Sequence, residues 1–142
     1  MAKRYLDEQG SEFIDGKYKL AWEGKDELFF SIWNISEFID VLVRKKKTKE
    51  LSESSFEEAM KDFQGEMMGL RGKQALIVVP TTDDLIERSW EIAIKEQIYV
   101  ADALQIATAL ERHCDLLVSG DNALVQHASK FIKTKFLGQD SV

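Results

Sequence analysis

The sequence predicts an α/β fold with a parallel, doubly wound sheet. Two aliphatic runs, "ALIVVP" (75–80) and "DLLVS" (115–119), have the composition of strands covered on both faces. Segments with apolar residues at helical spacing alternate with these strands, which is typical of a parallel, doubly wound sheet. With 142 residues and no visible linker or repeat, we expect a single domain over 1–142.

The first half of the chain is expected to hold three helices and one short strand. "SEFIDGKYKLAWEG" (11–24) has loose helical spacing, and Gly24 is a suitable end. Leu28–Ile32 has the pattern of a buried strand, and "NISEFIDVLVRKKK" (34–47) follows as a helix with cations in its last turn. Ser55 and Glu58 form a capping-box pattern for the next helix. Phe56 is expected on this helix. Met60, Phe63, Met67 and Met68 form an apolar face that we expect in the core; the alternative is a dimer surface.

The second half repeats the alternation of strand and helix. After the strand that ends at Pro80, Thr82 is expected to cap a helix. Another helix is expected in "VADALQIATALERH" (100–113), then the strand Asp115–Ser119. "NALVQHASKF" (122–131) predicts a last helix before a weak strand at 135–137. The apolar positions expected on the helix after Thr82 are Leu85, Ile86, Ala93 and Ile94.

Charge and cysteine content exclude some classes of protein. A net charge of −6 argues against a general polyanion-binding protein, although Arg44–Lys49 holds five basic residues. That run either contacts RNA phosphates or is a solvated helix end that complements the helix dipole. Cys114 is the single cysteine, so we expect no internal disulfide and a reducing cytoplasmic compartment. The chain has neither an apolar run of membrane-spanning length nor a secretory signal pattern.

Three acidic residues fall where the carboxyl ends of strands are expected. Glu37 follows the strand Leu28–Ile32, Asp121 follows the strand Asp115–Ser119, and Asp102 stands where a helix should begin. Ligands of open parallel sheets bind at this edge. Clustered carboxylates need a cation or a proton, and hard divalent ions with oxygen ligands can assist phosphodiester displacement. The alternative is that each acid is only a helix cap or a surface charge.

Two motifs in the C-terminal half carry a family resemblance. "ADALQIATAL" (101–110), followed by "LLVSGD" (116–121), resembles the C-terminal signature of PIN-domain ribonucleases, particularly VapC-type toxins of toxin–antitoxin systems. "ELFFSIWNISEFIDVL" (27–42) resembles the second strand of that family and the helix with its acidic residue. The resemblance covers nearly the whole chain. It implies a PIN-like (Rossmann-like) α/β fold, with three layers (α/β/α) around a mainly parallel sheet.

The resemblance implies a site and a set of partners. Glu37, Asp102 and Asp121 match three members of the family's acidic quartet, which would bind Mg²⁺ or Mn²⁺ and activate water to cleave single-stranded or loop RNA. Ser119 matches a polar position near the site and would be a helper. The implied partners are an RNA substrate, a second copy of the chain in a homodimer, and a cognate antitoxin that inserts a basic residue among the acids.

The N-terminus departs from the family pattern. The family opens with a strand that ends in an aspartate, and "MAKRYLDEQGS" (1–11) resembles only the continuation of that strand. We therefore expect the first strand and first aspartate to lie upstream of Met1; the alternative is that Asp7 or Asp15 is the fourth acid. Three acids would hold an ion more weakly than four, so we expect weak or no cleavage by the 142-residue chain. The competing function is a catalytically impaired PIN-like domain that only binds an antitoxin or dimerises.

Overall fold

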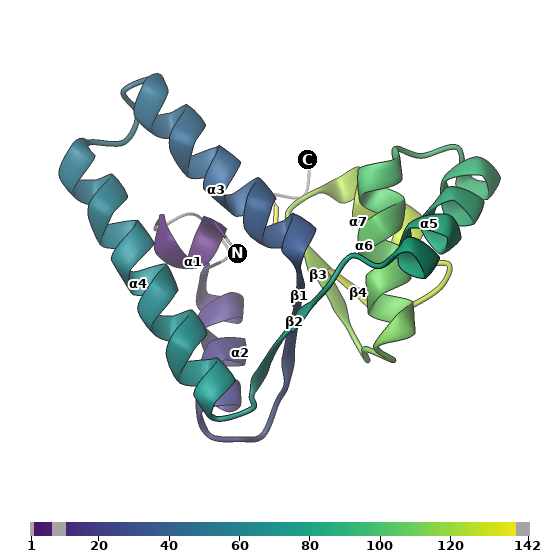
Figure 1. Cartoon of the computed structure of the whole chain (residues 1–142), viewed down its shortest axis with the longest axis horizontal. Helices are drawn as coiled ribbons and strands as arrows, with labels where there is room; N and C mark the ends of the chain where they lie inside the picture. The colour runs from purple at the N-terminus through teal and green to yellow at the C-terminus, as the bar shows by residue number, and fades with distance from the viewer. Residues whose placement is uncertain (1, 7–10, 139–142) are drawn as a thin grey trace. The chain divides into compact units, whose positions relative to one another are not determined.

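The computed structural model describes residues 2–6 and 11–138, in which helices and short strands alternate (Figure 1). The chain forms two compact units, Met1–Val78 and Val79–Val142. In chain order the elements are α1 (Ala2–Tyr5), α2 (Ser11–Trp22), β1 (Leu28–Ser31), α3 (Ile32–Lys47), α4 (Glu53–Gly72), β2 (Leu76–Val79), α5 (Asp83–Glu96), α6 (Val100–Glu111), β3 (Leu117–Ser119), α7 (Asn122–Ala128) and β4 (Thr134–Phe136).

The first unit buries its apolar side chains between α3 and α4. Phe38 and Leu42 of α3 pack against Ala59 and Phe63 of α4, and all four are buried. The ring of Tyr5, at the end of α1, lies 5.4 Å from that of Phe38 and 5.7 Å from that of Phe63. Strands β1 and β2 pair beside these helices. The apolar spacing of α3 and α4 therefore forms the core that the sequence predicts.

A polar network joins α1 to α2 and α4. The Arg4 guanidinium donates to both carboxylate oxygens of Glu66, at 2.7 and 3.2 Å, and to Asp15 at 2.6 Å. Tyr5 also donates to Glu66, at 2.8 Å. Burial raises the pKa of Tyr18 to about 12, so this neighbouring phenol keeps its proton at neutral pH. The Arg4–Glu66 contact joins α1 to α4, and its bidentate geometry makes it specific.

The second unit is built on a parallel strand pair. Strand β3 pairs with β4 in the register Leu117↔Thr134 and Ser119↔Phe136. Helix α6 lies at the centre, because most of its side chains from Ala103 to Ala109 are buried. One cluster joins α6, β3 and α7, and a smaller one joins α5 to α6. The buried members of the larger cluster are Ile106, Ala109, Leu117, Leu124 and Ala128.

The structure confirms the predicted order of helices and strands. Its strands lie in two two-stranded sheets, β1–β2 and β3–β4. The cap of α4 was predicted wrongly: Ser52 is the N-cap and accepts from the Ser55 N–H, so the helix begins three residues earlier. The Met68 side chain is 77% exposed, so it does not lie in the core of the chain, and the alternative of a dimer surface stays a prediction. Ile94 on α5 is 79% exposed. Among the described residues no helix is long and apolar enough to cross a bilayer.

Two glycines of α4 should respond oppositely to alanine. A Cβ at Gly69 would overlap the Trp22 ring, whereas a Cβ at Gly65 would meet nothing. We expect Gly69→Ala to lower the free energy of unfolding by about 1–3 kcal/mol through overpacking. Gly65→Ala should raise it by roughly 0.5–1 kcal/mol, because alanine is the better helix former. Urea unfolding of both variants measures this, and equal stabilisation by the two would contradict the close approach of Trp22.

Candidate functional site

Asp121 stands at the turn between β3 and α7, and local hydrogen bonds fix it there. Its backbone N–H donates to the Ser119 hydroxyl at 3.0 Å. Its Oδ1 accepts from the N–H groups of Ala123, at 2.8 Å, and Leu124, at 3.1 Å. Asp121 is therefore the N-cap of α7, which is the structural role that an aspartate at a helix start commonly has. Both cap bonds use the same carboxylate oxygen.

Asp102 lies in the first turn of α6, but it is not the cap. The N-cap is Tyr99, whose carbonyl accepts from the Asp102 N–H at 3.1 Å and whose side chain makes no cap bond. In the described part of the chain, the Asp102 carboxylate accepts no hydrogen bond. It is half-buried, while the next two side chains, Ala103 and Leu104, are buried in the core. Capping therefore does not explain why this residue is an aspartate.

The two carboxylates interact. Burial raises the pKa of Asp102, and the negative charge of Asp121 raises it further. Both effects disfavour the ionised form of Asp102 at neutral pH, the first by desolvation and the second by like-charge repulsion. The packing of Leu124 on α7 against Ile106 on α6 holds the two elements together. The second unit thus keeps two repelling carboxylates near each other, an arrangement that a cation would stabilise.

His127 is a further polar side chain near this pair. Its charge lowers the pKa of Asp102 and that of Glu96 on α5, so the ring lies close enough to affect both. Its Nδ1 is buried and has no hydrogen-bond partner among the described residues. The residue as a whole is half-buried. The spacing of residues in the sequence carried no signal that His127 would lie near Asp102.

The other two residues of the predicted site are Glu37 and Ser119. Glu37 is half-buried on α3, beside the buried Phe38, in the first unit. Its approach to Asp102 and Asp121 in the second unit stays a prediction. Ser119 contributes its hydroxyl to the backbone of Asp121. Within residues 2–6 and 11–138, no group of three His, Cys, Asp or Glu side chains forms a site that could hold a metal ion.

The structure describes Asp15 but not Asp7, the two candidates for a fourth acid. Asp15 forms an ion pair with Arg4 at 2.6 Å inside the first unit. Its carboxylate therefore takes part in the network that joins α1 and α2. Asp7 lies outside the described residues, so its role as a possible fourth acid stays a prediction.

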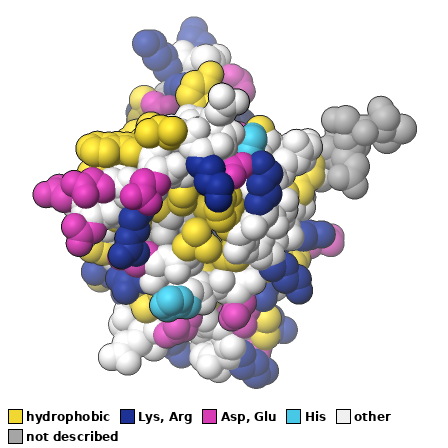
Figure 2. Space-filling view, turned by 90° about the vertical axis from the view of Figure 1, so that its right-hand side faces the viewer, with side chains coloured by type: hydrophobic (Ala, Val, Ile, Leu, Met, Phe, Trp, Pro, Cys, Tyr) yellow, Lys and Arg dark blue, Asp and Glu magenta, His cyan; other side chains and the backbone are white. Residues whose placement is uncertain are grey.

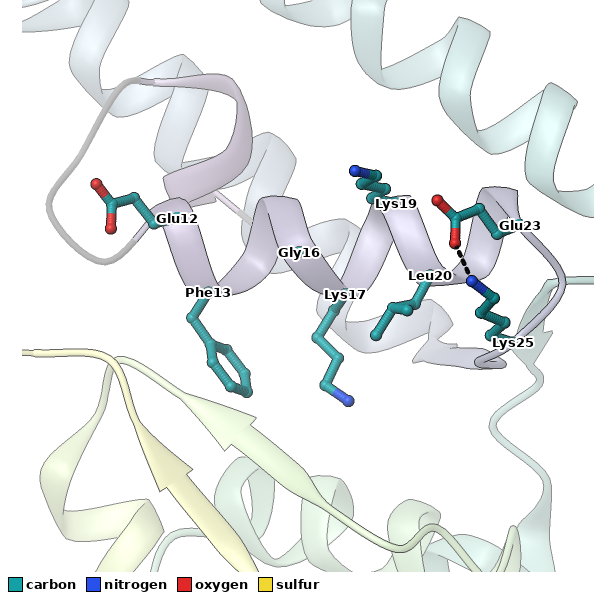
Figure 3. Close-up of a pocket in the computed structure, with 8 residues that line it drawn as sticks. All are labelled: Glu12, Phe13, Gly16, Lys17, Lys19, Leu20, Glu23 and Lys25. Atoms are coloured by element: carbon teal, nitrogen blue, oxygen red, sulfur yellow. Dashed lines mark hydrogen bonds and ion pairs between the residues drawn. The ribbon is translucent and has the colours of Figure 1, made fainter.

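Two other polar surfaces could be mistaken for a site. Three cations of the basic run on α3 form ion pairs with nearby carboxylates: Arg44 with Asp40, Lys45 with Glu50 and Lys46 with Glu53. This pattern favours a solvated helix end over a dedicated phosphate site. A hollow along α2 (Figure 3) contains none of the predicted acids, and Glu23 pairs with Lys25 at its rim. Its lining residues are Glu12, Phe13, Gly16, Lys17, Lys19, Leu20, Glu23 and Lys25.

Removing the charge of Asp102 should stabilise the metal-free chain. The pKa of Asp102 is higher in the folded chain than in the unfolded one, so the stability that its protonation provides at low pH is lost as pH rises through the raised pKa. Asp102→Asn should therefore raise the thermal unfolding midpoint at neutral pH, with a smaller gain at acidic pH. Thermal unfolding by circular dichroism measures both, and Asp115→Asn, at an exposed aspartate, is the matched control. A gain that grows as pH falls would contradict the assigned repulsion.

Comparison with known proteins places the chain in a family. The PIN domain family matches residues 10–130. No curated protein and no solved structure matches the chain significantly. PIN domains are Rossmann-like α/β proteins, which confirms the predicted fold class, and they are in general nucleases that act on nucleic acids with divalent metal ions. Because the match spans most of the sequence and the helices and strands alternate as this fold requires, the chain belongs to the PIN domain family.

Proposed function

We propose that the protein is a metal-dependent endoribonuclease of the VapC toxin type, with Glu37, Asp102 and Asp121 as its acidic residues. One observation supports this above the others: Asp121 raises the pKa of a half-buried Asp102 that makes no hydrogen bond in the described chain. Such a pair is unfavourable without a counter-charge. Membership of a nuclease family supplies the reason to expect a divalent cation there.

The donor chemistry of the pair suits Mg²⁺ or Mn²⁺. Both ions prefer carboxylate oxygens and complete their coordination with water, so two or three carboxylates are sufficient protein ligands. Asp102 and Asp121 would hold the ion, with Glu37 as the third acid. When bound, the ion supplies positive charge that offsets the negative charge of the phosphodiester during in-line displacement. Cys114 is not needed in this chemistry, and burial raises the pKa of its thiol above the ordinary value.

Neighbouring residues restrain the two aspartates of the proposed site. The two cap bonds to Oδ1 of Asp121 restrain its carboxylate and leave the second oxygen unused in capping. The Ser119 hydroxyl holds the backbone of Asp121 from the preceding strand, which is the helper role proposed for it. Asp102 is held by the buried residues that follow it on α6. Preorganised ligands of this kind lower the cost of binding an ion.

We also propose two protein partners, a second copy of the chain and a cognate antitoxin. The exposed apolar side chains of Met68 and Ile94, 77% and 79% exposed, support a protein contact on the helices. Light scattering at high micromolar concentration should show a dimer, and a monomer throughout would contradict it. Co-purification with the product of an adjacent gene tests the antitoxin, which we expect to present a basic residue to Asp102 and Asp121.

The chain should cleave RNA weakly, and only with Mg²⁺ or Mn²⁺. Asp102→Asn should abolish cleavage, because it removes the less solvated of the two charged ligands. Asp121→Asn should abolish it as well, even though an asparagine oxygen can still cap α7. Glu37→Gln tests the third acid. The measurement is cleavage of a labelled RNA that contains a single-stranded loop, with each ion and with a chelator.

Asp115→Asn is the control, since this exposed aspartate precedes β3 and has no role in the proposed site. It should cleave RNA as the parent does. Cleavage that survives in Asp102→Asn, or that needs no divalent ion, would overturn the proposed mechanism. A chain that binds its antitoxin yet leaves RNA intact with either ion would support the alternative, a catalytically impaired domain that acts only through binding.

A further inference from the structure

Tyr99 is the most exposed large apolar side chain in the described part of the molecule. It is 84% exposed, and the adjacent Val100 is 49% exposed. Within residues 2–6 and 11–138 the Tyr99 ring makes no ring contact, and its hydroxyl makes no hydrogen bond. Figure 2 looks onto the side of the molecule where α5 lies in Figure 1, and it shows apolar side chains at the surface among acidic and basic ones. The exposed ring contributes nothing to the core of the second unit.

The position of Tyr99 connects it to the candidate site. It is the N-cap of α6, and its carbonyl accepts from the N–H groups of Asp102, at 3.1 Å, and Ala103, at 3.0 Å. The backbone of Tyr99 therefore lies one helical turn before Asp102, whose carboxylate we assign to catalysis. A substrate strand whose phosphate lies at Asp102 would carry its neighbouring bases past this corner.

A structural reason for the tyrosine is lacking. An N-cap favours Ser, Thr, Asp or Asn, because their side chains accept from the free N–H groups of the first turn. Helices α3, α4, α5 and α7 follow this rule, with Ser31, Ser52, Thr82 and Asp121. Tyr99 makes no such bond. The N-cap position of α6, three residues before Asp102, therefore lacks a side chain that can cap the helix.

We propose that Tyr99 is a nucleotide-positioning residue whose ring stacks on an unpaired base of the RNA next to the cleaved phosphodiester. Stacking on an exposed aromatic ring is a general means of binding single-stranded nucleic acid, because every base has a π-face. This proposal rests on the proposed nuclease function and extends it to the substrate. It predicts a site for an unpaired base and not for a continuous duplex.

Tyr99→Ser separates stacking from stability. Serine restores the missing cap, so the thermal unfolding midpoint should rise, whereas the affinity for a labelled single-stranded RNA should fall about tenfold. Tyr99→Phe should bind RNA as the parent does, and Tyr99→Leu should bind as weakly as Tyr99→Ser. Trp90→Leu is the matched control, because Trp90 is 50% exposed on α5 and has no assigned role. Fluorescence anisotropy in Mg²⁺ gives the dissociation constants.

A double-mutant cycle locates the stacked base. The RNA is made with a single abasic nucleotide at each position in turn, and each is bound to the parent and to Tyr99→Ser. We expect the two losses to be non-additive at one position next to the cleavage point. Additive losses at every position, or equal RNA affinity of Tyr99→Leu and Tyr99→Phe, would overturn the assignment of Tyr99. Because binding is measured apart from cleavage, an additive cycle refutes only the role of Tyr99, whereas cleavage that survives in Asp102→Asn, or that needs no divalent ion, refutes the nuclease proposal.

Discussion

The repulsion between Asp102 and Asp121 connects the packing of the second unit to its proposed chemistry. The packing of Ile106, Leu117 and Leu124 joins α6, β3 and α7 in one apolar cluster. That cluster brings together two helix starts, each with an aspartate, and burial of Asp102 then makes their proximity unfavourable. Hydrophobic burial thus stabilises the unit while it holds two negative charges together. The divalent cation that we propose would remove this repulsion, so its binding should stabilise the second unit.

The simplest structural explanation accounts for only one of the two acids. Asp121 caps α7 with two hydrogen bonds to a single oxygen, and a purely structural aspartate would do the same. Asp102 differs, because it is the third residue of α6 and its carboxylate makes no hydrogen bond in the described chain. A half-buried carboxylate without a partner weakens a fold. Its presence therefore favours a role in binding, and the capping bonds of Asp121 are compatible with that role.

Local patterns in the sequence predicted the elements well. Helical spacing predicted α3 and α6, and the aliphatic runs predicted β2 and β3, because burial of a continuous apolar face decides these segments. The cap of α4 was missed, since both Ser52 and Ser55 suit that position and only the hydrogen bond distinguishes them. Tyr99 carried a signal that could have been used, namely an aromatic residue where a cap is expected three residues before Asp102. No signal in the sequence predicted the burial of Nδ1 of His127, because this burial depends on how α7 packs on its neighbours.

Paramagnetic broadening by Mn²⁺ in the NMR spectrum of the ¹⁵N-labelled chain tests whether Asp102 and Asp121 hold the ion. We expect substoichiometric Mn²⁺ to broaden the amide signals of the first turns of α6 and α7, around these two residues. The effect should disappear in the double variant Asp102→Asn, Asp121→Asn and persist in Asp115→Asn. Broadening centred elsewhere, or unchanged broadening in the double variant, would contradict the proposal that these two carboxylates form the metal site.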